Sequence, residues 1–266
     1  MFRILTTCLT LVILALPVRA DDKINQILEL SGLNEQLDMM PEMIASTVAQ
    51  GEQRVPADDI EIAENIFRKV FATERLKRHV QDELAGQFSD SEKAQLLTWY
   101  ESPLARRITA AEQSASEVDA AELQMVVGSL SDNEALVQLA VEVEQLTGIT
   151  DLMMRFQEQA ALSLYTTVAT IARPGQPLNF DQMKSGIRQQ MGGARDQTYN
   201  YMLAIMIYSW KDIPVEDLQK YRTFLRTEAA TRYVRLASKG MLDAMNMAFS
   251  DGFNQLIHRL EAEKSE

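Results

Sequence analysis

Apolar residues recur at intervals of three and four along most of the chain, and Pro and Gly occur at only a few points. The sequence has no sustained alternation of apolar and polar residues, the pattern that would indicate β-strands. It therefore predicts an all-α protein. The first segment of this kind runs from Ile24 to Leu30 and is followed by Ser31 and Gly32. Gly32 suits the left-handed conformation that ends many helices.

Two motifs of the chain occur twice. The segment ELSGL at 29–33 reappears as QLTGI at 145–149, and residues 88–107 align without gaps on residues 213–232. The offset between equivalent positions grows from 116 to 125, so the second copy carries nine extra residues between the two motifs. We expect this insertion in the loop 172–177, whose Pro and Gly residues disfavour a helix.

The repeat predicts a domain organisation of two diverged copies of one helical bundle. Turn-forming residues at 128–133 mark the junction, which is too short for a free tether, so the copies should pack against each other. The predicted segments are a signal peptide at 1–20, the first copy at 21–127, a longer second copy at 128–260 and a charged tail at 261–266.

Within the first copy the pattern predicts a second helix from about Asn34 to Ala49 and a loop at 50–59. A long segment follows whose apolar residues share one helical face as far as Leu84. Ser89 and Glu92 then have the spacing of a capping box, in which each side chain accepts a hydrogen bond from a free backbone N–H of the other residue.

The helix that starts at this box should end near Trp99 and Tyr100, before a sharp corner. Pro103 is favoured at the first position of a helix, and Ser102 before it can cap that helix, which is expected to continue into the 120s. These four residues are candidates for a structural motif rather than for catalysis. The second copy has Thr227 and a glutamate at this point, so its corner is expected to be softer or missing.

The segment 199–210 is apolar on nearly all sides, unlike its counterpart in the first copy, which keeps only one apolar stripe. A helix without a polar face must be covered on several sides. The cover could be a neighbouring helix or the other copy, a second subunit, or a lipid-like or peptide ligand. The candidate interface residues are Tyr199, Met202, Leu203, Met206, Ile207 and Trp210.

The first twenty residues have the features of a secretory signal peptide. Arg3 precedes an apolar run that is too short to span a bilayer, and the run ends at a small-x-small cleavage site closed by Ala20. We therefore expect export across the inner membrane, a periplasmic location and no transmembrane segment in the processed chain. The single cysteine, Cys8, lies in this leader, so thiol chemistry is not expected.

The formal net charge of −12 disfavours nucleic acid as a partner and favours basic ones. His79 and His258 each have acidic neighbours but no third converging ligand, and the clustered methionines are better explained as core fillers than as copper ligands. No cofactor, metal site or catalytic residue is predicted.

The motif around Trp99 resembles an exported bacterial helical family known as domain of unknown function 2059. Members of that family have an aromatic residue, Tyr, x, Ser, Pro, x, Gly, x, Lys at this point, where this chain has Ala105 for Gly and Arg107 for Lys. The resemblance covers most of 25–125 and, in outline, the second copy. It implies an all-helical envelope protein and no established activity.

Taken together, these features indicate an exported helical module that binds an unknown protein or a small hydrophobic ligand in the bacterial cell envelope, without catalysis. One alternative is a hydrolase of an envelope polymer that uses carboxylates such as Glu83 or Asp90 as acid and base. The other is an oligomeric structural scaffold, formed by several copies of the chain.

Overall fold

The computed structural model describes residues 21–49, 57–115, 118–130, 133–172 and 178–263, and all regular structure in these ranges is α-helical. The prediction of an all-α fold is therefore confirmed. The helices are α1 (Asp21–Leu30), α2 (Leu33–Ala49), α3 (Ala57–Val70), α4 (Thr73–Leu84), α5 (Asp90–Tyr100), α6 (Pro103–Ala115), α7 (Ala120–Leu130), α8 (Glu134–Thr147), α9 (Ile149–Ala172), α10 (Phe180–Met191), α11 (Ala194–Ser209), α12 (Val215–Leu225) and α13 (Glu228–Glu263).

Left-handed glycines separate the first two helices of each half. Gly32 has a φ of +78° between α1 and α2, and Gly148 has a φ of +62° between α8 and α9. A residue with a Cβ is strained in this conformation, so the glycine ends one helix and lets the next begin at once. The helix boundary predicted at Gly32 is confirmed.

Side-chain caps start both α5 and α6, as the sequence predicted. Ser89 Oγ accepts a hydrogen bond from the N–H of Glu92 at 3.2 Å, and the Glu92 carboxylate accepts one from the N–H of Ser89 at 2.7 Å. After α5, Ser102 Oγ accepts a hydrogen bond from the N–H of Ala105 at 3.1 Å and starts α6 at Pro103.

The second half has the same corner, contrary to the expectation that it would be softer or missing. α12 ends at Leu225, and Thr227 Oγ1 accepts a hydrogen bond from the N–H of Ala230 at 3.3 Å at the start of α13. A threonine hydroxyl caps a helix almost as well as that of serine, and proline favours a first helical turn without being required for it.

Four other predicted boundaries were wrong. α3 begins at Ala57, inside the loop predicted at 50–59. The long segment before Leu84 is broken into α3 and α4, because Ala72 adopts an extended conformation with ψ of 127°. The helix that starts at Pro103 stops at Ala115, and α7 occupies the 120s. α7 continues through Gly128 to Leu130, so part of the predicted junction is helical; one glycine in a last turn does not end a helix. The predicted signal peptide and residues 173–177 lie outside the described residues.

The helices of the two halves correspond in order: α1 to α6 match α8 to α13, and α7 connects the two sets. Within each half the first helix packs on the fifth, as α1 does on α5 and α8 does on α12. The last helix packs on the fourth helix of the other half: α6 contacts α11, and α13 contacts α4. The two halves thus exchange their last helices.

Individual contacts between the halves also occur in symmetric pairs. Arg107 forms an ion pair with Asp217 at 2.7 Å, and Arg232 forms one with Glu92 at 3.4 Å; each residue of one pair lies 125 positions from its counterpart in the other. At the same offset Trp99 stacks on Phe224, with ring centroids 4.5 Å apart and planes 9° apart. A twofold axis produces such reciprocal contacts. The origin of the halves by duplication stays a prediction.

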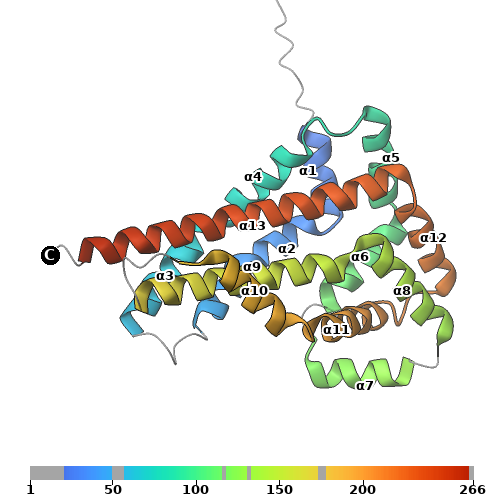
Figure 1. Ribbon diagram of the computed structural model, residues 1–266. Coiled ribbons are helices and arrows are strands. Elements are labelled where there is room, and N and C mark those ends of the chain that lie inside the picture. The colour runs from blue at the N-terminus through green and yellow to red at the C-terminus, as the bar shows by residue number, and fades with distance from the viewer. Residues whose placement is uncertain (1–20, 50–56, 116–117, 131–132, 173–177, 264–266) are drawn as a thin grey trace, which may run out of the picture.

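α13 crosses the whole molecule and joins its parts. It packs against α3, α4 and α5 of the first half and against α9 of its own half (Figure 1). Gly240 and Gly252 lie on its first-half side: a Cβ added at Gly240 would lie 3.4 Å from the backbone of Val80, and one at Gly252 would lie 2.9 Å from the ring of Phe67. Glycine therefore permits close approach of α13 to α4 and α3.

A groove between α9 and α13

The corner motif belongs to the packed interface between the halves. Trp99 stacks on Phe224 and Tyr221, and Tyr100 is buried with edge-on contacts to Phe224 and Tyr233. Burial raises the pKa of Tyr100 well above its usual value, so its hydroxyl stays protonated. Ser102 and Pro103 form the start of α6, as described above. Trp99 and Tyr100 thus pack α5 against α12 and α13.

The predicted interface residues on α11 lie mainly against other helices of the same chain. Met202, Ile207 and Trp210 are buried, and Tyr199, Leu203 and Met206 are half-buried. α11 packs against α6 from the first half, against the connecting helix α7, and against α8 and α9 from the second half. Tyr201 and other residues of one narrow face remain exposed. Whether a second subunit also contacts α11 stays a prediction.

One carboxyl group lies in this interface and was not singled out from the sequence. Glu112 on α6 accepts a hydrogen bond from the indole N–H of Trp210 at 3.2 Å. Although part of the residue is exposed, its carboxyl group is buried, and this burial raises its pKa to about 7. The hydrogen bond from Trp210 opposes that rise.

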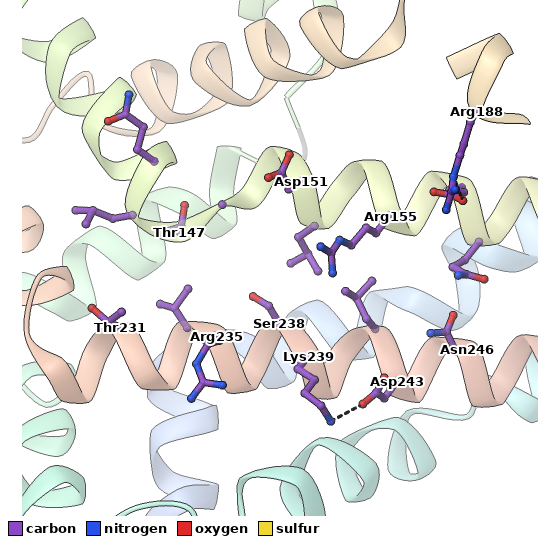
Figure 2. Close-up of a pocket in the computed structure, with 18 of the residues that line it drawn as sticks. Thr147, Asp151, Arg155, Arg188, Thr231, Arg235, Ser238, Lys239, Asp243 and Asn246 are labelled. Carbon is purple, nitrogen blue, oxygen red and sulfur yellow. Dashed lines mark hydrogen bonds and ion pairs between the residues drawn. The ribbon is translucent and has the colours of Figure 1, made fainter. Parts of the chain in front are cut away.

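A groove of about 820 Å³ lies between α9 and α13, bounded at its ends by α8 and α10 (Figure 2). This volume is in the range of binding sites for small molecules and peptides. Residues four apart on a helix share a face, so α13 lines the groove with two adjacent rows. One row is Val234, Ser238, Leu242 and Asn246, and the other is Thr231, Arg235, Lys239 and Asp243.

The groove carries more positive than negative side chains, in a chain whose net charge is −12. Its cationic residues are Arg155, Lys184, Arg188, Arg235 and Lys239, and its acidic residues are Asp151, Glu158 and Asp243. An excess of positive charge inside a strongly acidic molecule favours anionic groups at this position.

Some of these charges are already paired. Arg188 contacts Glu158 at 2.8 Å, and Lys239 contacts Glu83 at 2.7 Å and Asp243 at 2.8 Å. The hydrogen bonds from Lys239 to Asp243 and Glu83 raise the pKa of Lys239. Asp151 forms an ion pair with Arg195, just beyond the groove, at 2.8 Å.

Three cations in the groove have no such partner among the residues that the structure describes: Arg155, Lys184 and Arg235. Figure 2 shows Arg155 extending from α9 into the space between the two helices, opposite Ser238 on α13. Figure 2 shows Arg235 extending from α13 on the side away from α9. Arg155 is therefore the unpaired cation that faces the interior of the groove.

The equivalent position in the first half is closed. A Cβ added at Gly32 would lie 3.0 Å from both Thr109 and the side-chain amide of Gln113, and that amide donates a hydrogen bond to Glu35. At the same offsets the second half has Gly148, Val234, Ser238 and Asp151. A Cβ at Gly148 would meet nothing within 4 Å. The groove is thus open in the half that has Ser238 at the position where the other half has Gln113.

Sequence reasoning did not find this groove, because serine and arginine on a helix surface are unremarkable by themselves. The alignment of the two halves shows that Ser238 stands where the first half has Gln113. Only the packing of α13 on α9 shows that this difference leaves a groove open. Of the carboxylates of the hydrolase alternative, Glu83 is paired with Lys239, a residue of the groove lining, and Asp90 is an exposed residue at the start of α5. Among the described residues, no three potential ligands from His, Asp and Glu gather in one place.

Comparison with known proteins supports the predicted resemblance. Residues 74–131 match the family described as "Uncharacterized protein conserved in bacteria (DUF2059)". This segment contains α4, α5, α6 and α7, and so includes the corner motif at Trp99 and Pro103. The resemblance is confirmed for this part of the first half. No curated protein and no solved structure matches the chain. In the described ranges no helix has the length and apolar character needed to span a membrane.

Proposed function

We propose that this protein is a non-catalytic binding module of the bacterial cell envelope and that the groove between α9 and α13 holds its ligand. The observation that carries the proposal is the difference between the halves. The first half fills the space over Gly32 with Gln113, whereas the second half leaves the space over Gly148 open beside Ser238. Packed helical proteins contain few large openings, so a retained groove indicates a binding site.

The envelope location rests on the features of the first twenty residues and on the resemblance to a family whose members look exported. The groove offers guanidinium, amide, hydroxyl and aliphatic groups that can recognise a ligand. Its three carboxylates, Asp151, Glu158 and Asp243, are each held in an ion pair, which supports a role in binding rather than in acid–base catalysis.

Hydrogen exchange on the processed protein would test the proposal. In the presence of a bacterial envelope extract, we expect slower exchange in 145–159 and 231–246 than in buffer alone. The variant Ser238→Gln, which gives the second half the residue of the first, should lose this protection and still melt as a folded protein. Gln113→Ser is the matched control in the first half. Equal exchange with and without the extract, or protection that persists in Ser238→Gln, would contradict the assignment of the groove.

A further inference from the structure

We infer that the ligand of the groove is a short acidic peptide segment of a partner protein. This inference rests on the proposed function, because it names the ligand class of the same site. Three properties of the groove support it: an open space at Gly148 where the first half has a carboxamide, an unpaired guanidinium at Arg155, and aliphatic side chains placed between polar ones.

The first half shows which chemical group fits the space over the left-handed glycine. There the carboxamide of Gln113 lies against Gly32 and donates a hydrogen bond to the carboxylate of Glu35. In the second half Gly148 and Asp151 occupy the equivalent positions, and Ser238 is too short to fill the space. An amide N–H from a ligand could therefore take the place of the glutamine amide and donate to Asp151. A peptide presents such an amide at every residue other than proline.

The charges of the groove favour carboxylates that are spaced apart. Arg155 can bind a carboxylate through two parallel hydrogen bonds, and Lys184 adds a second unpaired cation. The carboxylates of Asp151, Glu158 and Asp243 interrupt the cationic residues. A polyphosphate, charged on every unit, would place phosphates against these carboxylates, at a cost in repulsion. A peptide, in contrast, can have acidic side chains at the positions that face cations and neutral side chains at the others.

The apolar side chains of the groove also fit a peptide. Leu146, Leu152, Val234 and Leu242 line it, with polar side chains between them, so the groove offers separate aliphatic contacts rather than the continuous apolar surface that an acyl chain needs. The lining part of α13, from Thr231 to Asn246, is about 22 Å long at ~1.5 Å per residue. An extended peptide of roughly seven residues has this length.

Binding of a defined peptide library to the full processed chain would test the inference. The library contains peptides of roughly seven residues made from Glu, Leu and Asn, each with a fluorescent label. A matched library replaces Glu with Gln. Polyphosphate and vesicles of anionic phospholipid serve as probes for the two other classes of anionic ligand. Fluorescence anisotropy, or a competition version of it, gives Kd for each probe at low and at raised salt concentration.

We expect selected Glu-containing peptides to bind, their Gln versions to bind at least about tenfold more weakly, and affinity to fall with salt. Arg155→Gln should weaken binding about tenfold, and Ser238→Gln should abolish it, with melting temperatures close to that of the parent protein. Arg78→Gln removes the same charge from an exposed position on α4 and should leave Kd unchanged.

Two results would overturn the inference. The first is peptide binding that is insensitive to both Arg155→Gln and Ser238→Gln, or equally strong for the Gln library. The second is absence of peptide binding while polyphosphate or vesicles bind in a manner that Ser238→Gln abolishes; the groove would then still be a ligand site, as the proposed function requires, but for another class. Failure of every probe together with no protection by envelope extract would overturn both proposals.

Discussion

At the boundary between the halves, some residues pack against each other and others form ion pairs. Trp99 and Phe224 occupy equivalent positions and stack on each other, whereas Arg107 and Arg232 hold reciprocal ion pairs at the surface. Exposed pairs of this kind contribute little, from zero to about 1 kcal/mol each. The aromatic contacts bury more surface, so they carry more of the stability of the boundary.

Glu112 provides a test at the residue scale. Its pKa in the folded protein is about 7, above the ordinary value of 4.5, so the native state holds a proton that the unfolded state has released between these pH values. The stabilisation is present in full below about pH 4.5 and is lost as pH rises through 7. At most about 3 kcal/mol is involved.

Glu112→Gln should remove this pH dependence, because glutamine can still accept the hydrogen bond from Trp210 and does not titrate. Urea unfolding of both proteins from pH 4.5 to 8 measures it. The parent protein should lose stability relative to Glu112→Gln as pH rises; the lowered pKa values of Glu92, Glu142 and Asp217 act in the opposite direction but cancel in the comparison. A constant difference across this range would show that the carboxyl group is not buried.

At the scale of elements, the ends of the helices are set by short-range hydrogen bonds that repeat in both halves. Left-handed glycines at 32 and 148 separate the first helix pair, and hydroxyl caps at Ser102 and Thr227 start the last helix. These features need only neighbours in the sequence, which explains why the boundaries at Gly32, Ser89 and Pro103 could be predicted. The break at Ala72 has no such signal: no proline or glycine lies beside it, and no side chain caps the start of α4.

Removing either hydroxyl cap should destabilise the protein by a similar amount. Ser102→Ala and Thr227→Ala each leave a backbone N–H at a helix start without its acceptor, at a cost of about 1 kcal/mol. Ser114→Ala is the control, because that exposed hydroxyl only donates to a carbonyl within α6. Chemical denaturation measures all three. A loss at Ser102 with none at Thr227 would mean that the second corner depends on packing rather than on its cap.

The close approach of α13 to α3 predicts opposite effects for two glycine substitutions. A Cβ at position 252 would lie 2.9 Å from Phe67, a buried ring held by Phe71 and Phe249, so Gly252→Ala should cost about 1 to 3 kcal/mol. Gly186→Ala in α10 meets nothing within 4 Å and should stabilise the protein by up to about 1 kcal/mol through helix propensity. Thermal unfolding measures both. Equal stabilisation by both substitutions would show that α13 and α3 are further apart.

At the scale of the whole molecule, the exchange of last helices makes each half depend on the other. α6 covers α11 and α13 covers α4, so separating the halves would expose apolar faces on both sides. One continuous apolar core extends from Ile24 in α1 to Leu256 in α13. The arrangement favours a single folding unit over two independent domains.

Hydrogen exchange in low denaturant tests this cooperativity. Buried amides of α4 in the first half and of α12 in the second should open with the same free energy and the same dependence on denaturant, because neither half keeps its cover when the other unfolds. Exposed amides near the ends of α10 serve as an internal reference for local opening. Two distinct free energies, one for each half, would contradict a single unit and favour separate domains.

The sequence by itself determined the fold class and those helix ends that local hydrogen bonds define, since periodicity, glycine and capping residues act over a few positions. Only the tertiary structure decided which helix covers which: that the last helices are exchanged, that Glu112 meets Trp210, and that Arg155 faces an opening beside Ser238. The physical reason is that these contacts join residues far apart in the chain. Their positions depend on how whole helix faces pack, and no single residue type reports that arrangement.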